Sequence, residues 1–176
     1  ITKQSLKAKQ QFGFVPDNPD VLLRLKGIEY LNFIASVYNV DHTVVAERIS
    51  SLAKRFEIQD ALNDKISSYS HGMRQKLMII GVLLHQPANW ILDEPLTGLD
   101  PKSAFTLKEM MREHADAGNT VLFSTHVLDV AEKVCDRIGI LSHGKLVFVG
   151  TIEDLRKQTA KDESLEELFL ELTNHE

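Results

Sequence analysis

The sequence has almost no cysteine and no long apolar run. Cys135 is its single cysteine, which excludes an internal disulfide, and the first residues lack the basic and apolar pattern of a secretory leader. The longest strongly apolar run, Leu77 to Leu84, is far shorter than the roughly 20 residues that a membrane-spanning helix needs. We therefore expect a cytoplasmic protein that reaches a membrane only through a partner.

The sequence also lacks an excess of basic side chains. Its 25 acidic residues outnumber its 20 basic ones, and the net charge of -5 argues against a protein that grips nucleic acid. It contains no internal repeat, no low-complexity segment and no linker rich in Pro, Gly or Ser. Because 43% of the 176 residues are hydrophobic, the composition predicts an ordinary globular chain with one substantial core.

Apolar residues at helical spacing predict three helices in the first half of the chain. The pattern from about Gly27 to Phe56 indicates a helical pair with a turn at Asn39 to Asp41. A third helix is expected from Met73 to His85, after the polar loop Ser67 to Gly72 and before Pro87.

Further along the chain, short apolar runs alternate with helical segments. Strands are expected at 90–92, 121–123 and 138–141, with helices at 101–117 and 127–134. This alternation indicates βαβ units and a largely parallel sheet with helices on both faces. Residues 141–149 are expected to form a hairpin with His143 and Gly144 in its turn. Two short helices should follow, the second over residues 163–172.

Two carboxylates come directly after the strand expected at 90–92. In open α/β sheets ligands bind at the carboxyl ends of the strands, so Asp93 and Glu94 mark the candidate site. Successive side chains at a strand end point in different directions, so that Asp93 can serve Mg²⁺ while Glu94 addresses a water molecule. The alternative is that this pair merely opens a solvated loop, and the dipeptide taken alone favours that alternative.

Two more polar segments are candidates for the same site. Ser124 to His126 follows the next expected strand and brings an imidazole to the edge of the sheet that carries the acids. Ser70 to Met73 opens a helix, where a hydroxyl, a glycine and free backbone N–H groups can bind phosphate oxygens. Taken singly, Ser70 is better explained as a helix N-cap, and His126 as a capping or packing residue.

Together these segments resemble the ATP-binding subunits of ABC transporters, from Ile1 to about Glu153. Tyr69-Ser-His-Gly-Met73 resembles the signature motif, Ile91-Leu-Asp-Glu-Pro95 the Walker B motif with its glutamate, Thr97-Gly-Leu-Asp100 the D-loop, and Ser124-Thr-His126 the switch histidine. Phe12-Gly-Phe-Val-Pro-Asp17 occupies the place of the Q-loop. Ser164-Leu-Glu-Glu-Leu-Phe-Leu170 further resembles the end of ATPases that serve bacterial exporters of drugs, peptides or lipids.

The resemblance implies an α/β fold, the C-terminal part of a P-loop NTPase-like ABC ATPase domain, with a mostly parallel sheet, flanking helices and a helical subdomain. It implies a truncated ABC ATPase domain over residues 1–155 and a C-terminal helical tail over 156–176. Within the domain, residues from about 22 to 85 would form the helical and signature subdomain. Residues 86–155 would run from Walker B to the C-terminal part of the core.

The resemblance also implies ATP hydrolysis that powers transport, with ATP and Mg²⁺ as cofactors. Two nucleotide-binding domains would close head to tail around two ATP molecules, on the cytoplasmic face of the cell membrane. A separate membrane permease would contact the helical subdomain, so exposed apolar residues between Gly27 and Phe56 become candidate docking residues. No nucleic-acid partner is implied.

Each implied role falls on a named position. Glu94 would polarise the attacking water, His126 would bridge the γ-phosphate to the opposite D-loop, and Asp93 would hold Mg²⁺ through water. Ser70, Gly72 and Met73 belong to the signature, which would contact the ATP of the partner subunit, and Asp100 of the D-loop would couple the two sites. These roles suit phosphoryl transfer, where positioning and charge stabilisation supply most of the catalysis.

The sequence departs from the family pattern in three places. No G-x-x-x-x-G-K-S/T motif occurs, so we expect the phosphate-binding loop to precede Ile1 and the 176 residues alone to hydrolyse little ATP. Asp17 stands where the family usually has a glutamine that contacts Mg²⁺, and the metal would have to offset this added charge. His71 replaces the first glycine of the signature.

Two rival functions compete with the transport ATPase. Soluble ABC ATPases that act on nucleic acid or ribosomes usually carry a long insertion between Q-loop and signature, whereas Asp17 and Tyr69 are close in this sequence. A regulatory, non-catalytic ABC-like module would be expected to lose the glutamate or the histidine, and both Glu94 and His126 are present. The sequence therefore favours the transport ATPase.

Overall fold

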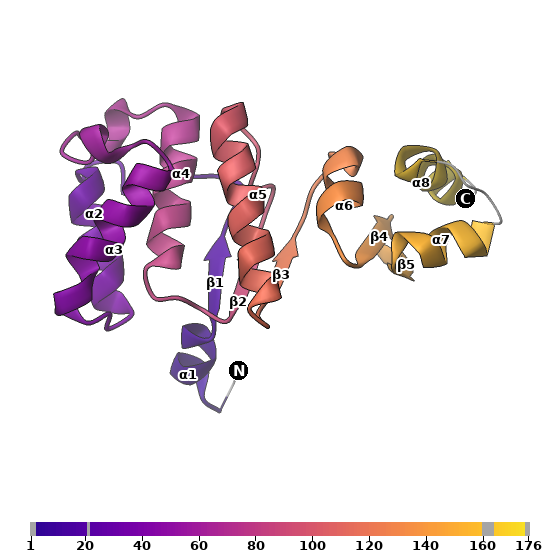
Figure 1. The fold of residues 1–176 in the computed structure, drawn as a ribbon, viewed down its shortest axis with the longest axis horizontal. Helices are drawn as coiled ribbons and strands as arrows, with labels where there is room; N and C mark the ends of the chain where they lie inside the picture. The colour runs from indigo at the N-terminus through magenta and orange to yellow at the C-terminus, as the bar shows by residue number, and fades with distance from the viewer. Residues whose placement is uncertain (1–2, 21, 160–163, 175–176) are drawn as a thin grey trace. The chain divides into compact units, whose positions relative to one another are not determined.

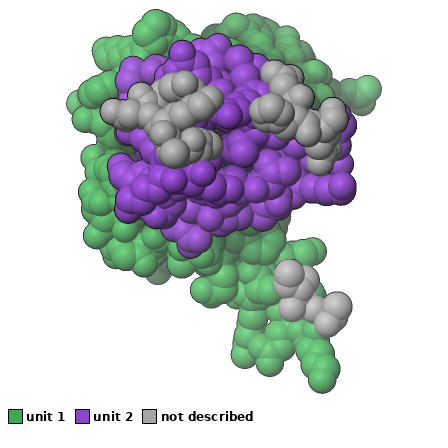
Figure 2. Space-filling view, turned by 90° about the vertical axis from the view of Figure 1, so that its right-hand side faces the viewer, with its two compact units in different colours: residues 1–124 green, residues 125–176 purple. Residues whose placement is uncertain are grey.

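The computed structural model describes residues 3–20, 22–159 and 164–174. The chain divides into two compact units, residues 1–124 and residues 125–176, which Figure 2 colours green and purple. None of the described helices combines the length and the apolar character needed to cross a membrane.

A parallel three-stranded sheet lies at the centre of the first unit. Its strands are β1 (Phe12–Val15), β2 (Asn89–Leu92) and β3 (Thr120–Phe123), in the order β1-β2-β3. Val15 pairs with Leu92, and Leu92 with Phe123, so the three carboxyl ends lie side by side. The strands expected at 90–92 and 121–123 are confirmed, together with their parallel pairing, and β1 adds a strand that the sequence pattern did not predict.

Two long helices cover one face of this sheet (Figure 1). Helix α4 (His71–Leu83) packs on β1, and α5 (Pro101–Asp116) packs on β3. A Cβ added to Gly13 would lie 2.2 Å from Val82 of α4, and the neighbouring Trp90 ring stacks on His114 of α5 at 4.1 Å. Both helices therefore lie on the face that carries Gly13 and Trp90.

The opposite face of the sheet departs from the expectation of helices on both sides. Phe14 and Leu122, which share this face with Ile91, are 50% and 63% exposed. In this part of the described structure, residues on this face are more exposed than their neighbours along each strand, which is the pattern of a sheet covered on one face.

The expected helical pair is confirmed. It consists of α2 (Gly27–Val37) and α3 (His42–Arg55), and the carboxylate of Asp41 caps α3 by accepting a hydrogen bond from Thr43 N. The buried stripe of the pair includes Leu31 and Ile49, which are 0% and 3% exposed. Three short helices complete the unit: α1 (Ser5–Gln10), η1 (Gln59–Ala61) and η2 (Ile66–Ser68).

The second unit is a hairpin with three helices. Its elements are α6 (Leu128–Val134), β4 (Ile138–Ser142), β5 (Lys145–Gly150), α7 (Ile152–Thr159) and α8 (Leu165–Asn174). The hairpin turn is confirmed, because His143 and Gly144 have φ of 48° and 78°, the signs that a tight I′-type turn requires.

The prediction for the strand at 138–141 was wrong about the sheet to which it belongs. The apolar run at 138–141 indicated another parallel strand, but β4 pairs antiparallel with β5 in a separate two-stranded sheet. The reason is the short turn at His143 and Gly144, which brings the very next strand alongside β4.

The C-terminal helices bury apolar residues against this hairpin. Leu155 of α7 and Leu168 of α8 are 0% exposed and belong to one core cluster with Ile138 and Phe148. The expected start of the last helix at residue 163 lies outside the described residues. The boundary predicted at residue 155 differs from the division between the compact units at residue 124, and the predicted domain limits remain predictions.

Candidate functional site

Asp93 and Glu94 lie where the central strand ends, as expected. The backbone N–H of Asp93 donates to Val15 O at 2.8 Å, which continues the pairing of β2 with β1 one residue beyond the strand. Asp93 is exposed and Glu94 is half-buried. Asp93 and Glu94 thus follow the central strand of the sheet, at the edge where the carboxyl ends of all three strands meet.

The sequence did not single out Ser124, which joins these acids to β3. Its Oγ donates to Asp93 Oδ1 at 2.6 Å, and the backbone N–H of Glu94 donates to the same Oγ at 3.0 Å. Glu94 has φ of 44°, a left-handed conformation that costs about 1–3 kcal/mol for a residue with a side chain. One hydroxyl therefore connects the two acids at the point where the backbone is strained.

The signature turn caps a helix in the structure. Ser70 Oγ accepts a hydrogen bond from Met73 N at 3.2 Å, and α4 begins at His71, two residues earlier than expected. The capping explanation of Ser70 is therefore confirmed, while its contact with phosphate stays a prediction. An N-cap serine leaves further backbone N–H groups of the first turn available for an anion.

The signature turn and the D-loop pack against each other. A Cβ added to Gly72 would lie 2.4 Å from the carbonyl oxygen of Gly98, so Gly72 must lack a side chain for a reason independent of any ligand. Gly98 has φ of +75°, and a Cβ placed on it would lie 2.4 Å from Cδ2 of His71. The imidazole that replaces the first signature glycine is thus accommodated by a glycine in the D-loop.

Asp100 is held by two elements at once. Its carboxylate caps α5, where Oδ1 accepts from Ser103 N at 2.9 Å, and Oδ2 forms an ion pair with Lys76 of α4 at 2.7 Å. The Lys76 side chain is only 10% exposed. The hydrogen bond from Lys76, followed by those from Ser103, holds the pKa of Asp100 well below its usual range.

Two predicted site residues lie near the ends of the outer strands. Asp17 is exposed, two residues beyond β1. His126 is exposed and is the second residue of the second compact unit, three residues beyond the end of β3. The structure brings Ser124 to the two acids, and the approach of His126 to them stays a prediction.

The donor atoms at this edge fit a magnesium ion that is held partly by substrate. In the described part of the chain no group of three or more His, Cys, Asp or Glu side chains is arranged to hold a metal ion. Magnesium in phosphoryl-transfer sites takes only one or two carboxylates, with phosphates and waters as its other ligands. The exposed Asp93 carboxylate keeps lone pairs beyond the one that accepts from Ser124, so it suits this role.

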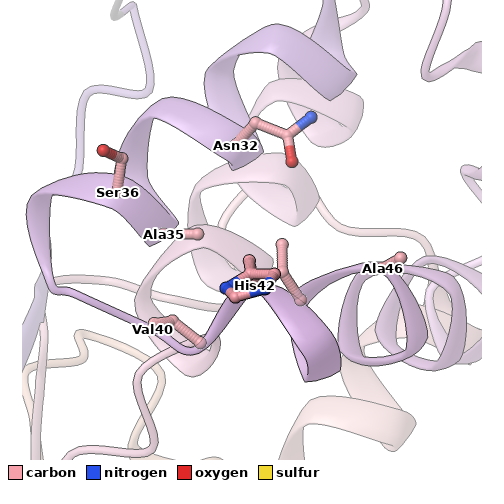
Figure 3. Close-up of a pocket in the computed structure, with 7 residues that line it drawn as sticks. Asn32, Ala35, Ser36, Val40, His42 and Ala46 are labelled. Carbon is pink, nitrogen blue, oxygen red and sulfur yellow. The ribbon is translucent and has the colours of Figure 1, made fainter.

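A hollow on the helical pair is a separate feature. It has a volume of about 320 Å³ and is lined by Asn32, Ala35, Ser36, Val40, His42, Val45 and Ala46. Figure 3 shows these residues on and between α2 and α3. It contains none of the predicted site residues, so it is not a candidate for the ATP site.

Comparison with known proteins decides the family. The protein-family model described as ABC transporter matches residues 2–97, more than half of the chain. The ATP-binding protein EcsA of Bacillus subtilis is 37% identical over 169 residues, which cover 96% of this chain and 68% of EcsA. The chain belongs to the ABC transporter ATP-binding family.

Other members of the family support this assignment. The linearmycin resistance ATP-binding protein LnrL of Bacillus subtilis is 32% identical, and the match covers 92% of this chain and 52% of LnrL. A solved ATP-binding subunit of an ABC transporter superposes with a TM-score of 0.91 at 34% identity, covering 97% of this chain and 72% of the other. The P-loop NTPase-like α/β fold is thereby confirmed.

The sequence did not indicate the part that two residues play at this candidate site. Ser124 was noted only as part of the segment leading to His126, and Lys76 only as part of a helix. Their partners Asp93 and Asp100 lie 31 and 24 residues away, so no local spacing connects them. The one available signal was a basic residue on an otherwise apolar helix stretch, Lys76-Leu-Met-Ile-Ile80.

Proposed function

We propose that this chain is part of an ATP-hydrolysing subunit that powers transport through a separate membrane permease. The observation that carries the proposal is the pair Asp93 and Glu94 at the carboxyl end of the central strand, joined to β3 by Ser124. Ligands of open α/β sheets bind at such strand ends. Membership of the ABC transporter ATP-binding family supports ATP as that ligand.

The chemical roles follow from the donor atoms. Glu94 would orient and polarise the attacking water, and Asp93 would hold Mg²⁺ through water. Asp17 and His126 would approach from the ends of β1 and β3, His126 toward the γ-phosphate. Bound Mg²⁺ would neutralise the charge that develops on the phosphate oxygens.

A second nucleotide-binding domain would complete the site. Ser70, Gly72 and Met73 begin α4, where the helix dipole and free backbone N–H groups favour an anion. We propose that they contact ATP bound by the partner domain, and that Asp100 couples the two sites from the adjoining D-loop. The packing of Gly72 on Gly98 supports this proposal, because it makes the two segments neighbours.

The permease would dock on the helical pair. Phe33 and Val37, one turn apart on α2, are 50% and 56% exposed and are the apolar side chains that we propose for this contact. The protein would then act peripherally on the cytoplasmic face of the membrane, without a nucleic-acid partner. The name of LnrL, a resistance protein, supports an exporter as the transporter served.

The proposal is tested by ATP hydrolysis in a longer chain that carries a phosphate-binding loop ahead of Ile1. We expect Mg²⁺-dependent hydrolysis, and a fall in kcat of at least about 100-fold in the Glu94→Gln variant, because positioned bases contribute roughly 10²–10⁴-fold. Glu109→Gln, an exposed glutamate on α5, is the matched control and should leave kcat unchanged. The 176 residues alone should hydrolyse little ATP.

Equal hydrolysis by the wild type and Glu94→Gln would refute a catalytic role for the Walker B glutamate. No hydrolysis by any variant, with ATP still bound, would favour the regulatory, non-catalytic alternative.

A further inference from the structure

We propose that Ser124 is a positioning residue for ATP hydrolysis, setting the relative placement of the Asp93 carboxylate and the Glu94 backbone. The inference rests on the proposed function and concerns the same site. Ser124 is the first residue after β3, so its backbone is fixed by the sheet, and Ser124 N donates to Leu92 O at 3.0 Å. The serine is thus anchored to β2 directly before the two acids.

The direction of each hydrogen bond follows from the atoms involved. A backbone N–H can only donate, so Ser124 Oγ must accept from Glu94 N, at 3.0 Å. A hydroxyl has a single proton, which is therefore directed at Asp93 Oδ1, at 2.6 Å. The short distance is typical of an O–H group donating to a carboxylate. Both hydrogen-bonding functions of the hydroxyl are used, one on each acidic residue.

This arrangement holds a backbone conformation that the chain would otherwise avoid. With φ of 44°, Glu94 lies in the left-handed region, where residues with a side chain need support from their surroundings. The hydrogen bond to Ser124 fixes the N–H of this strained residue, and hence the direction in which its side chain leaves the backbone. The same hydroxyl fixes one carboxylate oxygen of Asp93 and leaves the other for Mg²⁺-bound water.

Three substitutions of Ser124 distinguish the effect of its hydroxyl from the effect of its size. Alanine removes both hydrogen bonds, whereas cysteine keeps nearly the same shape but is a weak donor and acceptor. Threonine keeps the hydroxyl. If the hydroxyl positions the two acids, activity should follow its presence and not the size of the side chain.

Hydrolysis is measured in the longer chain that includes a phosphate-binding loop, for Ser124→Ala, Ser124→Cys and Ser124→Thr. We expect kcat to fall by about 10- to 100-fold in the alanine and cysteine variants, the usual effect of removing a partner that orients a ligand or catalytic group. The KM for ATP should change much less than kcat, because Ser124 itself is not proposed to contact ATP. Threonine should restore most of kcat. Ser50→Ala, an exposed serine on α3, is the control and should match the wild type.

A second readout needs neither nucleotide nor catalysis. The Glu94 amide should exchange its hydrogen faster in Ser124→Ala than in the wild type or Ser124→Thr, because its acceptor is lost. Wild-type kcat in the alanine and cysteine variants, or unchanged exchange of the Glu94 amide, would overturn the proposal.

The outcomes for Ser124 and for the proposed function are distinguishable. Hydrolysis that depends on Glu94 but is unaffected by Ser124→Cys refutes the positioning role alone. Absence of hydrolysis in the wild type refutes both the proposed function and the positioning role of Ser124. In a Glu94→Gln background, Ser124→Ala should lower the residual kcat much less than it does in the wild type, because the side chain that it positions is already disabled.

Discussion

At the scale of single residues, the His71 ring lies where a side chain at position 98 would have to be. The imidazole replaces a glycine that the family usually has in its signature, and it fits because Gly98 lacks a Cβ. Gly98 also has φ of +75°, a conformation that glycine adopts without strain. Because the His71 ring and a side chain at position 98 would need the same space, the two positions should depend on each other.

Substitution of Gly98 should reveal this dependence. Gly98→Ala should lower the free energy of unfolding by about 2–4 kcal/mol, because it adds a clash with His71 to the strain of a left-handed alanine. In the His71→Gly background the same change should cost only about 1–2 kcal/mol, the backbone part alone. The measurement is chemical denaturation of the four variants of the cycle.

Gly118→Ala provides the matched control. Gly118 has φ of +86° and nothing within 4 Å of an added Cβ, so alanine there should cause only the backbone cost, with or without His71. Equal destabilisation by Gly98→Ala in both His71 backgrounds would contradict the proposed dependence.

At the level of residues, the sequence predicted what is visible in adjacent positions and missed what depends on distant partners. The place of Asp93 and Glu94 directly after a strand is confirmed, because two acids follow an apolar run, and their chemical roles stay predictions. Ser124 was passed over because its importance comes from hydrogen bonds to residues about 30 positions earlier. The capping role of Ser70 was foreseen from its place before a helix, which is a local property.

At the scale of elements, Asp100 ties two helices together. It caps α5 and pairs with Lys76 of α4, so a single carboxylate serves the helix that follows the D-loop and the helix that follows the signature. Lys76 is largely buried and would be left without its partner if this carboxylate lost its charge.

The stability of this link should depend on pH. Because the pKa of Asp100 is lowered in the folded protein, its stabilising effect is complete above the unfolded pKa of about 3.9 and is lost as the pH falls below that value. Asp100→Asn keeps a good N-cap but does not titrate. The wild type should exceed this variant by about 1 kcal/mol at pH 6, a value limited by the half-exposed carboxylate.

This difference in unfolding free energy should shrink as the pH is lowered from about 5 to about 2. Urea denaturation at several pH values measures it. A difference that stays constant over this range would show that the charge of Asp100 does not stabilise the fold.

Helices and strands were predictable where the apolar pattern extends over many residues, and ambiguous where the segment is short. The helical pair and α5 were placed within a few residues, because their apolar residues recur over several turns. Strand β1 was not expected, because Phe12-Gly-Phe-Val15 has four residues and a glycine, too little to show a period. Strand β4 was assigned to the wrong sheet, because an apolar run does not say which strand it will pair with.

At the scale of the whole molecule, composition predicted one substantial core, and the chain forms two compact units. The second unit has its own apolar cluster built from the hairpin and the last two helices. Composition averages over the chain, so it does not reveal such a division. The order of motifs along the chain identified the family correctly, because signature, Walker B glutamate, D-loop and switch histidine occur in a fixed sequence.

The central claim is that Glu94 acts in the chemical step of ATP hydrolysis. A single-turnover experiment tests it most directly: the longer chain with a phosphate-binding loop is mixed with a limiting amount of ATP and Mg²⁺, and bound ATP and ADP are quantified over time. We expect Glu94→Gln to bind ATP as the wild type does but to convert it to ADP at least about 100 times more slowly. Conversion of bound ATP at the wild-type rate by Glu94→Gln would contradict this claim.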